Sequence, residues 1–355
     1  MADTINFLQN GYAGEVLEDL LTYTAQGNDT FKEGLIHIKS GIQHQYTLPA
    51  IKIGNVIQDN VPTPTSNHGA KGENGENEYT LTERTLVPQD FMVYLEFNPR
   101  DYEKYWKFAQ PDGNLVFREL DPKIQATMLR LLIEKKNEYI GNAIWTAAKG
   151  GTARAGITAP ADGAPIGANK EKYFDGFIKR VIDNVTATDP ETIAGGQCVI
   201  SGTTELTDGA SVEKALYAMW KKCPKQIRKK SSLVFVIGWD AWDAYDQYIS
   251  DKQVKYTENT EVNKYRFKGK RIIPIVGIPE HTMVLGELTT GMESNLWMGV
   301  DYANDTDVLK VDRLQSNSEL YFFQMRMKMD VNIVRPAEIV VHTAYKKTEP
   351  SGGGE

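Results

Sequence analysis

The sequence predicts an α+β protein with an elongated body, and three stretches of the chain carry this prediction. Residues 319–334 alternate between apolar and polar side chains, as one long amphipathic strand does. Residues 46–97 contain two strand-like runs around a segment rich in Gly, Pro and Asn, and residues 122–149 follow a helical pattern that would span roughly 42 Å. A long helix crossed by a long strand makes a flat slab, whereas ordinary strands run about five or six residues. A long strand within a large twisted sheet remains the alternative.

The composition is that of a folded chain of 355 residues, of which 41% are hydrophobic and 25% charged, with a net charge of −7. This length allows two or three compact units. The negative charge argues against a nucleic-acid coat protein, which needs clustered Lys and Arg. We find no apolar run of membrane-span length and expect no signal peptide. Cys198 and Cys223 are too few for a disulfide framework, so we expect two packing cysteines in a reducing compartment.

The first part of the chain predicts an arm followed by a hairpin. Residues 1–45 form an extended N-terminal arm with one short helix near 16–21, and we expect a neighbouring subunit to order it. Residues 46–97 form an extended hairpin loop with an exposed tip at 59–77. Because two-stranded hairpins are marginal in water, we expect this one to lie on another chain. A hairpin with a decorated loop inside an ordinary sheet is the alternative.

Residues 98–187 predict a peripheral domain built on a spine helix at 122–149. Asp121 suits the cap, Pro122 suits the first helical position, and Gly150 and Gly151 end the helix. One stripe of the helix should face the core; it comprises Leu129, Ile133, Ile140, Ile144 and Ala147. The polar residues at 135–138 should lie on the other side. After a surface loop at 151–170 we expect an amphipathic helix at 173–185, with Phe174, Phe177, Ile178, Val181 and Ile182 on its inner side.

Residues 188–302 alternate helical and strand patterns, which predicts a compact α/β axial domain. A helix should begin at Asp208, followed by an apolar strand at 233–237 and an aromatic helix at 239–249. Further strands are expected at 271–276, 283–285 and 296–300. Residues 303–355 then return to the peripheral domain with the long strand, a closing hairpin through 338–344 and a disordered tail.

The sequence contains no GxxxxGK phosphate loop, no GxSxG elbow and no HExxH motif. We therefore predict that the chain is not an enzyme and has no catalytic, cofactor or metal residues. Gly69, Gly72 and Gly75 lack the strand-then-helix context of a phosphate cradle. The histidines lack metal-type partners, and we expect each to be structural or solvated; they are His37, His44, His68, His281 and His342.

Two charged clusters allow more than one interpretation. Asp240, Asp243 and Asp246 share one helix face and could hold a divalent cation, but a solvated face beside a favourable helix dipole explains them better. A basic run could suggest a nucleic-acid patch, but its aromatic neighbours are sparse. A positive helix end or an interface with an acidic subunit surface fits it better. The run comprises Lys221, Lys222, Lys225, Arg228, Lys229 and Lys230.

The order of these elements resembles the major capsid proteins of tailed bacteriophages, which have the Hong Kong ninety-seven type of fold. The matching parts are the hairpin at 46–97, the spine helix and the segment FDGF from Phe174. Further matches are LVFVIGWDAWDAY from Leu233, KGKRIIPIVGIPEHTMVLGE from Lys268 and MRMKMDVNIVRPAEIVVHTAY from Met325. The resemblance covers nearly the whole chain and rests on order and pattern.

The resemblance implies a structural protein that assembles with itself into hexamers and pentamers of an icosahedral shell around the double-stranded DNA of a tailed phage. It implies a portal, a separate scaffolding protein or else unaided assembly, decoration proteins in some relatives, DNA bound without sequence specificity and no membrane. The implied location is the virion capsid, assembled in the bacterial host cytoplasm. Some relatives crosslink through a Lys and an Asn with a Glu nearby; Lys71 lies in the hairpin tip, and no partner is assigned to it.

Two rival functions remain open. An encapsulin-like compartment would keep the same fold and enclose a cargo enzyme. An α/β hydrolase or transferase with a large insertion would instead be a monomer or small oligomer with a deep polar pocket.

Overall fold

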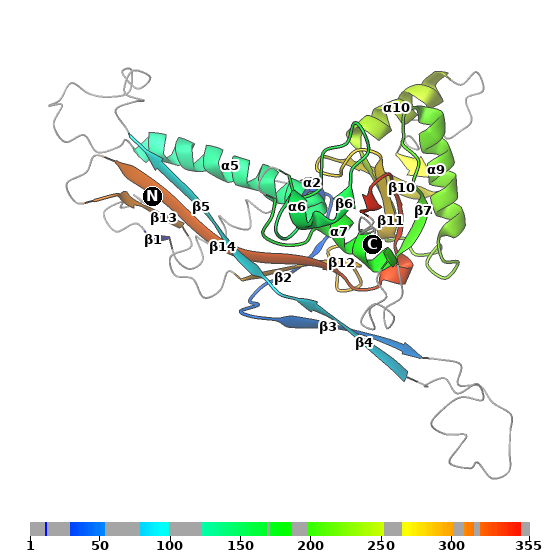
Figure 1. The fold of residues 1–355 in the computed structure, drawn as a ribbon, viewed down its shortest axis with the longest axis horizontal. Coiled ribbons are helices and arrows are strands. Elements are labelled where there is room, and N and C mark those ends of the chain that lie inside the picture. The colour runs from blue at the N-terminus through cyan, green and yellow to red at the C-terminus, as the bar shows by residue number, and fades with distance from the viewer. Residues whose placement is uncertain are drawn as a thin grey trace, which may run out of the picture.

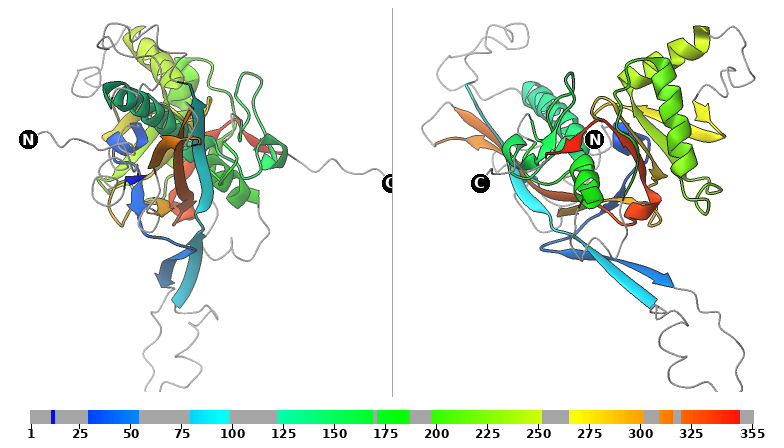
Figure 2. Two further views of the ribbon diagram at one scale, coloured as in Figure 1. Left: turned by 90° about the vertical axis from the view of Figure 1, so that its left-hand side faces the viewer. Right: turned by 45° about the vertical axis from the view of Figure 1, so that its right-hand side comes forward.

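The computed structural model describes residues 11–12, 29–53, 79–98, 122–168, 171–186, 198–251, 265–301, 309–315 and 320–348. These residues form two large sheets, a long helix that follows one of them, and a two-stranded hairpin that projects away from the body (Figure 1). Figure 2 shows the same projecting hairpin in two further views. The predicted α+β class and elongated shape are confirmed. Among the described helices, none combines the length and apolar character needed to cross a membrane.

The first sheet, called the long sheet, is organised around β14 (Tyr321–Ile333). One edge of β14 pairs with β5 (Gln89–Phe97), and its other edge pairs with β13 (Leu309–Arg313) and β12 (Leu296–Asp301). β1 (Gly11–Tyr12) continues the sheet beside β13, and β2 (His37–Lys39) continues it in parallel beside β12. The predicted alternation is confirmed as far as Met329, because Phe323, Met325, Met327 and Met329 are buried while the positions between them are exposed or half-buried. It is wrong for the end of the strand, where Asp330 and Asn332 are buried as well because they tie the strand to the base of the hairpin.

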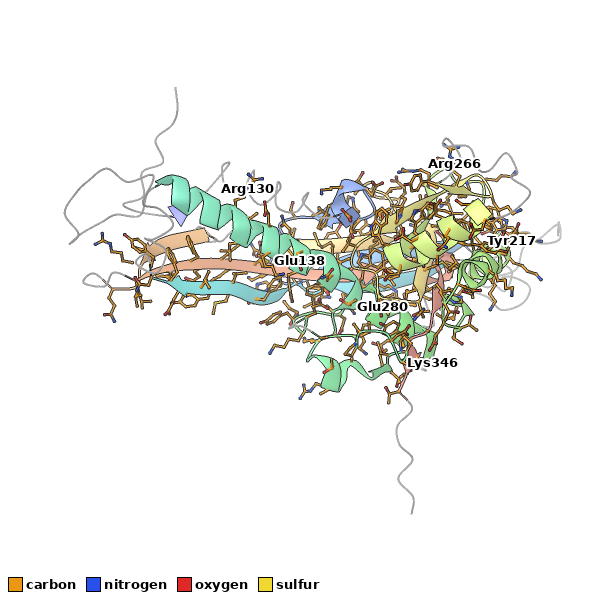
Figure 3. All side chains as sticks on the ribbon, turned by 90° about the horizontal axis from the view of Figure 1, so that it is seen from above. Arg130, Glu138, Tyr217, Arg266, Glu280 and Lys346 are labelled. Carbon is orange, nitrogen blue, oxygen red and sulfur yellow. The ribbon has the colours of Figure 1, made fainter. Side chains whose placement is uncertain are left out.

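Helix α5 (Pro122–Thr146) lies along one face of the long sheet (Figure 3). It begins at the predicted proline but ends before residue 149, because the loop that follows takes over its last carbonyl groups. Gly167 N donates to Thr146 O at 2.8 Å, and Gly176 N donates to Ala147 O at 2.8 Å. The stripe of Ile133, Ile140, Ile144 and Ala147 is buried in the main core, as predicted.

One prediction about α5 is wrong. Lys136 and Asn137, expected on the solvated side, are only 6% and 8% exposed. The reason is helical periodicity: both follow Ile133 by three or four positions and precede Ile140 by the same spacing, so they share the buried face. Burial lowers the pKa of Lys136 to about 8.

The second sheet, called the α/β sheet, has the strand order β7-β15-β11-β8-β10-β9. Its strands are β7 (Val199–Gly202), β15 (Val340–Thr343), β11 (Thr282–Glu287), β8 (Leu233–Gly238), β10 (Lys270–Ile275) and β9 (Arg266–Phe267). Helices α9 (Gly209–Lys222) and α10 (Trp239–Asp251) pack on it. Asp208 caps α9 through a reciprocal capping box with Ser211, which confirms the predicted start. Alternate residues of β8 face two different cores: Phe235 packs with α9 and α10, and Val236 packs with the main core.

The hairpin is shorter than the predicted 46–97. β3 (Tyr46–Ile53) pairs only with β4 (Tyr79–Leu86), whereas β5 pairs with β14 in the long sheet. Pro88 separates β4 from β5 because it has no amide to continue a ladder. Val87 N then donates to Asp330 Oδ2 at 2.9 Å, which directs the chain into the long sheet. The predicted tip, with His68, Lys71 and the three glycines, lies outside the described residues.

The described parts of the predicted arm, residues 11–12 and 29–45, lie on their own chain; the first of them pairs with β13. Leu35, Ile36 and Ile42 are 1%, 1% and 4% exposed, next to α2 (Asp29–Lys32) and β2. Trp145 Nε1 on α5 donates to Thr30 Oγ1 at 3.0 Å. The prediction that a neighbour orders the whole arm is therefore wrong for this part, because its apolar residues find a place in the core of their own subunit. The predicted helix near 16–21 lies outside the described residues.

Two strands belong to a different sheet from the one expected from the sequence. β12, expected in the axial domain, pairs with β14, and β15, expected in the peripheral domain, inserts between β7 and β11. Every residue of β15 is buried, which requires a position inside a sheet that is covered on both faces. β16 (Lys346–Lys347) then pairs with β6 (Ile157–Thr158), which follows the short helix α6 (Thr152–Ala155).

Helix α7 (Phe177–Thr186) begins later than the predicted residue 173. The preceding residues are irregular and pass the end of α5, where Gly176 approaches so closely that a Cβ would lie 2.8 Å from Ala143 O. The five residues predicted on its inner side are all buried; they are Phe174, Phe177, Ile178, Val181 and Ile182.

Candidate interaction surfaces

The hairpin β3–β4 is anchored at its base and projects beyond it (Figure 1). Leu48 and Leu86 pack with Ile42 and Trp297 in a small core of their own. Tyr46 stacks on Trp297 with ring centroids 6.4 Å apart. Beyond this base the described strands form a two-stranded sheet that pairs with no third described strand. Such a ribbon is marginal in water by itself, so its projecting part is a candidate contact surface.

The base is also tied to the long sheet by a buried carboxylate. Asp330 is 2% exposed and accepts from Val87 N at 2.9 Å and from Arg180 Nη2 at 3.1 Å. Asn332 Nδ2 donates to Thr85 O at 2.8 Å. Burial raises the pKa of Asp330, and the Arg180 charge and the backbone hydrogen bonds oppose this only in part. These contacts fix the angle at which the hairpin leaves the body.

The face of the long sheet opposite α5 exposes apolar side chains. Met92 is 57% exposed and Tyr94 44%, and Tyr94 stacks on Phe322 at 5.9 Å. Leu95, on the other face of β5, is 45% exposed. A groove of about 480 Å³ on the β5–β14 pair is lined by Asp90, Phe91, Met92, Arg326, Met327 and Lys328. In the described part of the chain the outer edge of β5 pairs with no strand, so this region offers both apolar area and free backbone groups.

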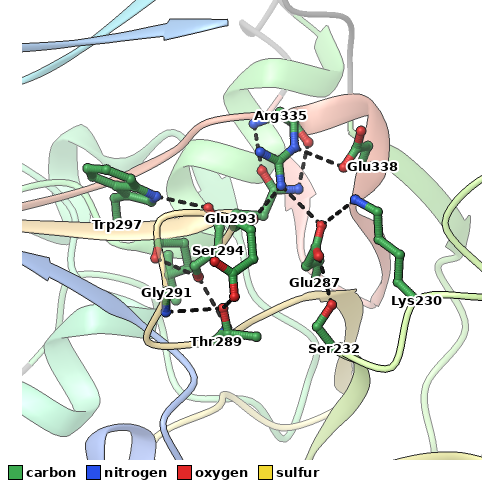
Figure 4. Close-up of polar contacts among 12 residues, drawn as sticks. Lys230, Ser232, Glu287, Thr289, Gly291, Glu293, Ser294, Trp297, Arg335 and Glu338 are labelled. Atoms are coloured by element: carbon green, nitrogen blue, oxygen red, sulfur yellow. Dashed lines mark hydrogen bonds and ion pairs between the residues drawn. The ribbon is translucent and has the colours of Figure 1, made fainter.

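A buried ionic cluster joins the two sheets (Figure 4). Glu287, at the end of β11, is 3% exposed and accepts from Lys230 Nζ at 2.6 Å, Ser232 Oγ at 2.7 Å and Arg335 Nη2 at 3.2 Å. Arg335 also bonds Glu338 Oε2 at 2.9 Å. Burial acts to raise the pKa of Glu287, but the hydrogen bonds from Lys230 and Ser232 and the nearby positive charges outweigh it and hold this pKa below its usual range.

The aspartates predicted on one helix face lie on α10. Asp240 and Asp243 are exposed, and Asp246 is half-buried. Across the described residues, no group of His, Cys, Asp and Glu has the arrangement of a metal site. The exposure of Asp240 and Asp243 supports the solvated-face interpretation.

The basic run lies at the end of α9 and before β8. Arg228 Nε donates to Cys223 O at 3.0 Å and its Nη2 donates to Lys221 O at 2.9 Å, so Arg228 satisfies carbonyl groups at the end of the helix. Lys230 belongs to the Glu287 cluster. The positive helix end, one of the two preferred interpretations, therefore accounts for part of this run.

Three of the four described histidines make structural hydrogen bonds, and the fourth, His44, is exposed to solvent. His281 Nδ1 accepts from Leu206 N at 2.9 Å, so its Nε2–H donates to Asp162 Oδ1 at 2.8 Å, and this bond lowers the pKa of Asp162. His342 Nε2 donates to Thr204 O at 2.9 Å, and burial lowers its pKa. His37 Nδ1 lies 2.6 Å from Thr290 O.

Both cysteines are buried and free, which confirms their packing role. Burial raises the pKa of the Cys198 thiol to about 12, so this group is chemically inert at neutral pH.

Sequence reasoning missed Asp330 and Glu287. Asp330 occupies one of the polar positions of the alternating strand, so nothing in the pattern marked it as buried. For Glu287 the only signal was a carboxylate directly after four apolar or small residues of a strand. A buried carboxylate in such a position needs a donor, but the sequence does not reveal which one.

Comparison with solved structures places this arrangement among phage capsids. The chain is similar to one in the capsid asymmetric unit of cyanophage A-1(L), with a TM-score of 0.56 and 12% identity over 98% of both chains. It is similar to one in the procapsid of satellite phage P4 that includes the size determination (Sid) protein, with a TM-score of 0.53 and 11% identity over 95% of this chain and 93% of that one. A third is the capsid of Myoviridae phage XM1, with a TM-score of 0.52 and 10% identity over 97% and 96%.

No family model matches the sequence, and no curated protein matches it either. At 10–12% identity the structural likeness shows the fold. The chain therefore has the tailed-phage capsid fold of the Hong Kong ninety-seven type, and the resemblance inferred from the sequence is confirmed at the level of fold.

Proposed function

We propose that the chain is the major capsid protein of a tailed phage, which assembles with itself into hexamers and pentamers of an icosahedral shell around double-stranded DNA. The observation that carries this proposal is the match to capsid chains over nearly the full length of both partners, 98% of each for cyanophage A-1(L). A match that includes the projecting hairpin and both sheets supports a shared mode of assembly, because these parts have no evident use in a solitary molecule.

The surfaces described above support self-association. The hairpin projects from the body, and the β5–β14 region exposes Met92 and Tyr94. In the described chain the outer edge of β5 is also unpaired. We infer that a neighbouring copy covers them. Many modest contacts of this kind add up across a closed symmetric assembly.

The proposal includes the predicted division of the chain into four structural parts. The assembly parts are the arm at 1–45, the extended loop at 46–97, the peripheral domain at 98–187 with its continuation at 303–355, and the axial domain at 188–302. We assign β5 and β12 to the proposed peripheral domain and β15 to the proposed axial domain, because β5 and β12 pair with β14 and β15 pairs with β11.

The remaining partners follow from the same proposal. They are a portal, a separate scaffolding protein, decoration proteins in some related capsids, and DNA held without sequence specificity. The chain would act in the virion after assembly in the host cytoplasm, without catalysis and without a cofactor.

Negative-stain microscopy of the expressed, purified chain tests the proposal. Closed, uniform shells support it. Because a separate scaffolding protein is among the proposed partners, a monomer or small oligomer refutes the proposal in favour of the compact enzyme when particles from the native source also lack this chain. The contents of shells isolated from the native source separate the other rival. DNA and a single portal vertex indicate the phage capsid, whereas one enriched enzyme indicates an encapsulin-like compartment.

A further inference from the structure

The α/β unit carries opposite charges at the two ends of its central strand. The basic run at 221–230 comes just before β8, and α10 with its aspartates starts directly after β8 at Trp239. The 6 residues of β8 separate the two ends by roughly 20 Å. Figure 1 agrees with this, because α10 lies across one end of the unit and α9 runs away from it toward the other.

Three residues of the basic run already form hydrogen bonds within the chain. Lys222 Nζ donates to Ile200 O at 2.9 Å, and Arg228 and Lys230 have the partners given above. Lys221, Lys225 and Lys229 are different. Their side chains are exposed, and within the described residues they form no hydrogen bond or ion pair. These three residues are called the basic end below.

The acidic end is formed by Asp240 and Asp243. Both are exposed on the side of α10 away from the buried Trp242 and Tyr245, and in the described chain neither side chain has a hydrogen-bond or ion-pair partner. Gly209 packs so closely on α10 that a Cβ would lie 2.3 Å from Ala244 O. The N-terminus of α9 and its cap Asp208 therefore lie at this end too, while the C-terminus of α9 lies at the basic end.

We propose that, in the shell proposed above, the basic end of one copy contacts the acidic end of the α/β unit in the next copy. The two patches differ and lie at opposite ends of one unit, so the contact is head-to-tail, and such contacts close into rings when the rotation fits. A two-fold contact through either patch would instead bring like charges together. Exposed ion pairs are individually weak, so their effect is to select the register and reject wrong contacts.

Charge reversal in the full chain tests this contact. The basic-end variant is Lys221→Glu/Lys225→Glu/Lys229→Glu, the acidic-end variant is Asp240→Lys/Asp243→Lys, and a combined variant has all five changes. A matched control is Lys346→Glu/Lys347→Glu, which reverses exposed lysines on β16. The yield of sedimenting particles is measured on gradients and by microscopy, and far-UV circular dichroism checks folding.

Each one-ended variant should lose particles at least about tenfold, because like charges then face each other at every contact. The combined variant should recover most of the yield, because it restores opposite charges with their positions exchanged. The control should match the unaltered chain. If a reversal variant fails to fold, Asp240→Asn/Asp243→Asn should still lower the yield and reduce its sensitivity to salt.

Normal yields from both one-ended variants would overturn the contact alone and leave the proposed function intact. A defect confined to the basic-end variant, without recovery in the combined variant, would also overturn it and would indicate nucleic acid or another protein as the occupant. If the unaltered chain forms no particles by itself and is also absent from particles of the native source, the proposed function is refuted, and the contact with it.

Discussion

Replacing Glu287 by Ala should destabilise the folded subunit by about 3–5 kcal/mol, the cost of removing one partner from a buried ion pair. The structure sets this magnitude. The carboxylate is 3% exposed and accepts from Lys230, Ser232 and Arg335 at 2.6, 2.7 and 3.2 Å. Each hydrogen bond to a charged group contributes about 1.5–3 kcal/mol, but the sum is reduced because Lys230, 42% exposed, regains water.

Equilibrium urea denaturation of the unassembled subunit measures this loss. Glu338→Ala is the matched control, because Glu338 bonds the same Arg335 at 2.9 Å but is 29% exposed, and its loss should cost only about 0.2–1 kcal/mol. A cost below about 1 kcal/mol for Glu287→Ala would refute the view that this cluster holds the two sheets together.

The same residue gives a dependence on pH. The folded-state pKa of Glu287 lies below its unfolded value, so the unfolded chain binds more protons in this window. The stabilisation is therefore fully present above the unfolded pKa and is lost as the pH falls through the folded pKa. Glu287→Gln should flatten the acid limb of the stability curve, and an unchanged limb would contradict the assignment.

Further predictions concern the hairpin, the exposed strand and the arm. Deleting residues 60–77 should leave the circular dichroism of the subunit unchanged and weaken its shells; equal particle stability would count against the role of the loop. Leu86→Ala removes a side chain that is 0% exposed and should cost about 2–5 kcal/mol, with faster amide exchange in β3 and β4. Met92→Lys, at a position 57% exposed, should change the unfolding free energy by less than about 0.5 kcal/mol but reduce the yield of shells, whereas unchanged yield would remove this strand from the contact. Trp145→Phe loses the bond to Thr30 and should cost about 1 kcal/mol on urea denaturation; no loss would argue against docking of residues 29–45 on their own chain.

Local patterns were sufficient for the longer elements, whereas the short strands β2, β7 and β13 were not predicted. The period of two in β14, the proline that opens α5 and the Asp208 cap of α9 are encoded within a few residues, so the sequence predicts them. Strand partners are decided by contacts between distant segments. β5 and β15 could therefore be recognised as strands but not assigned to the correct sheet.

The same limit applies to the interaction surfaces. The projecting hairpin followed from two strand patterns around a polar tip, but its shorter length depends on Pro88 and on the bond between Val87 and Asp330, 243 positions apart. The buried position of Lys136 was available from helical spacing, and only the expectation that a lysine faces water concealed it.

Electron cryo-microscopy of the assembled particles, at a resolution that traces β3 and β4, tests the central claim most directly. We predict closed shells in which the hairpin of each copy lies on a neighbouring copy and covers part of its apolar surface. A particle, or a solitary molecule, in which residues 46–86 fold back on their own subunit would contradict the account.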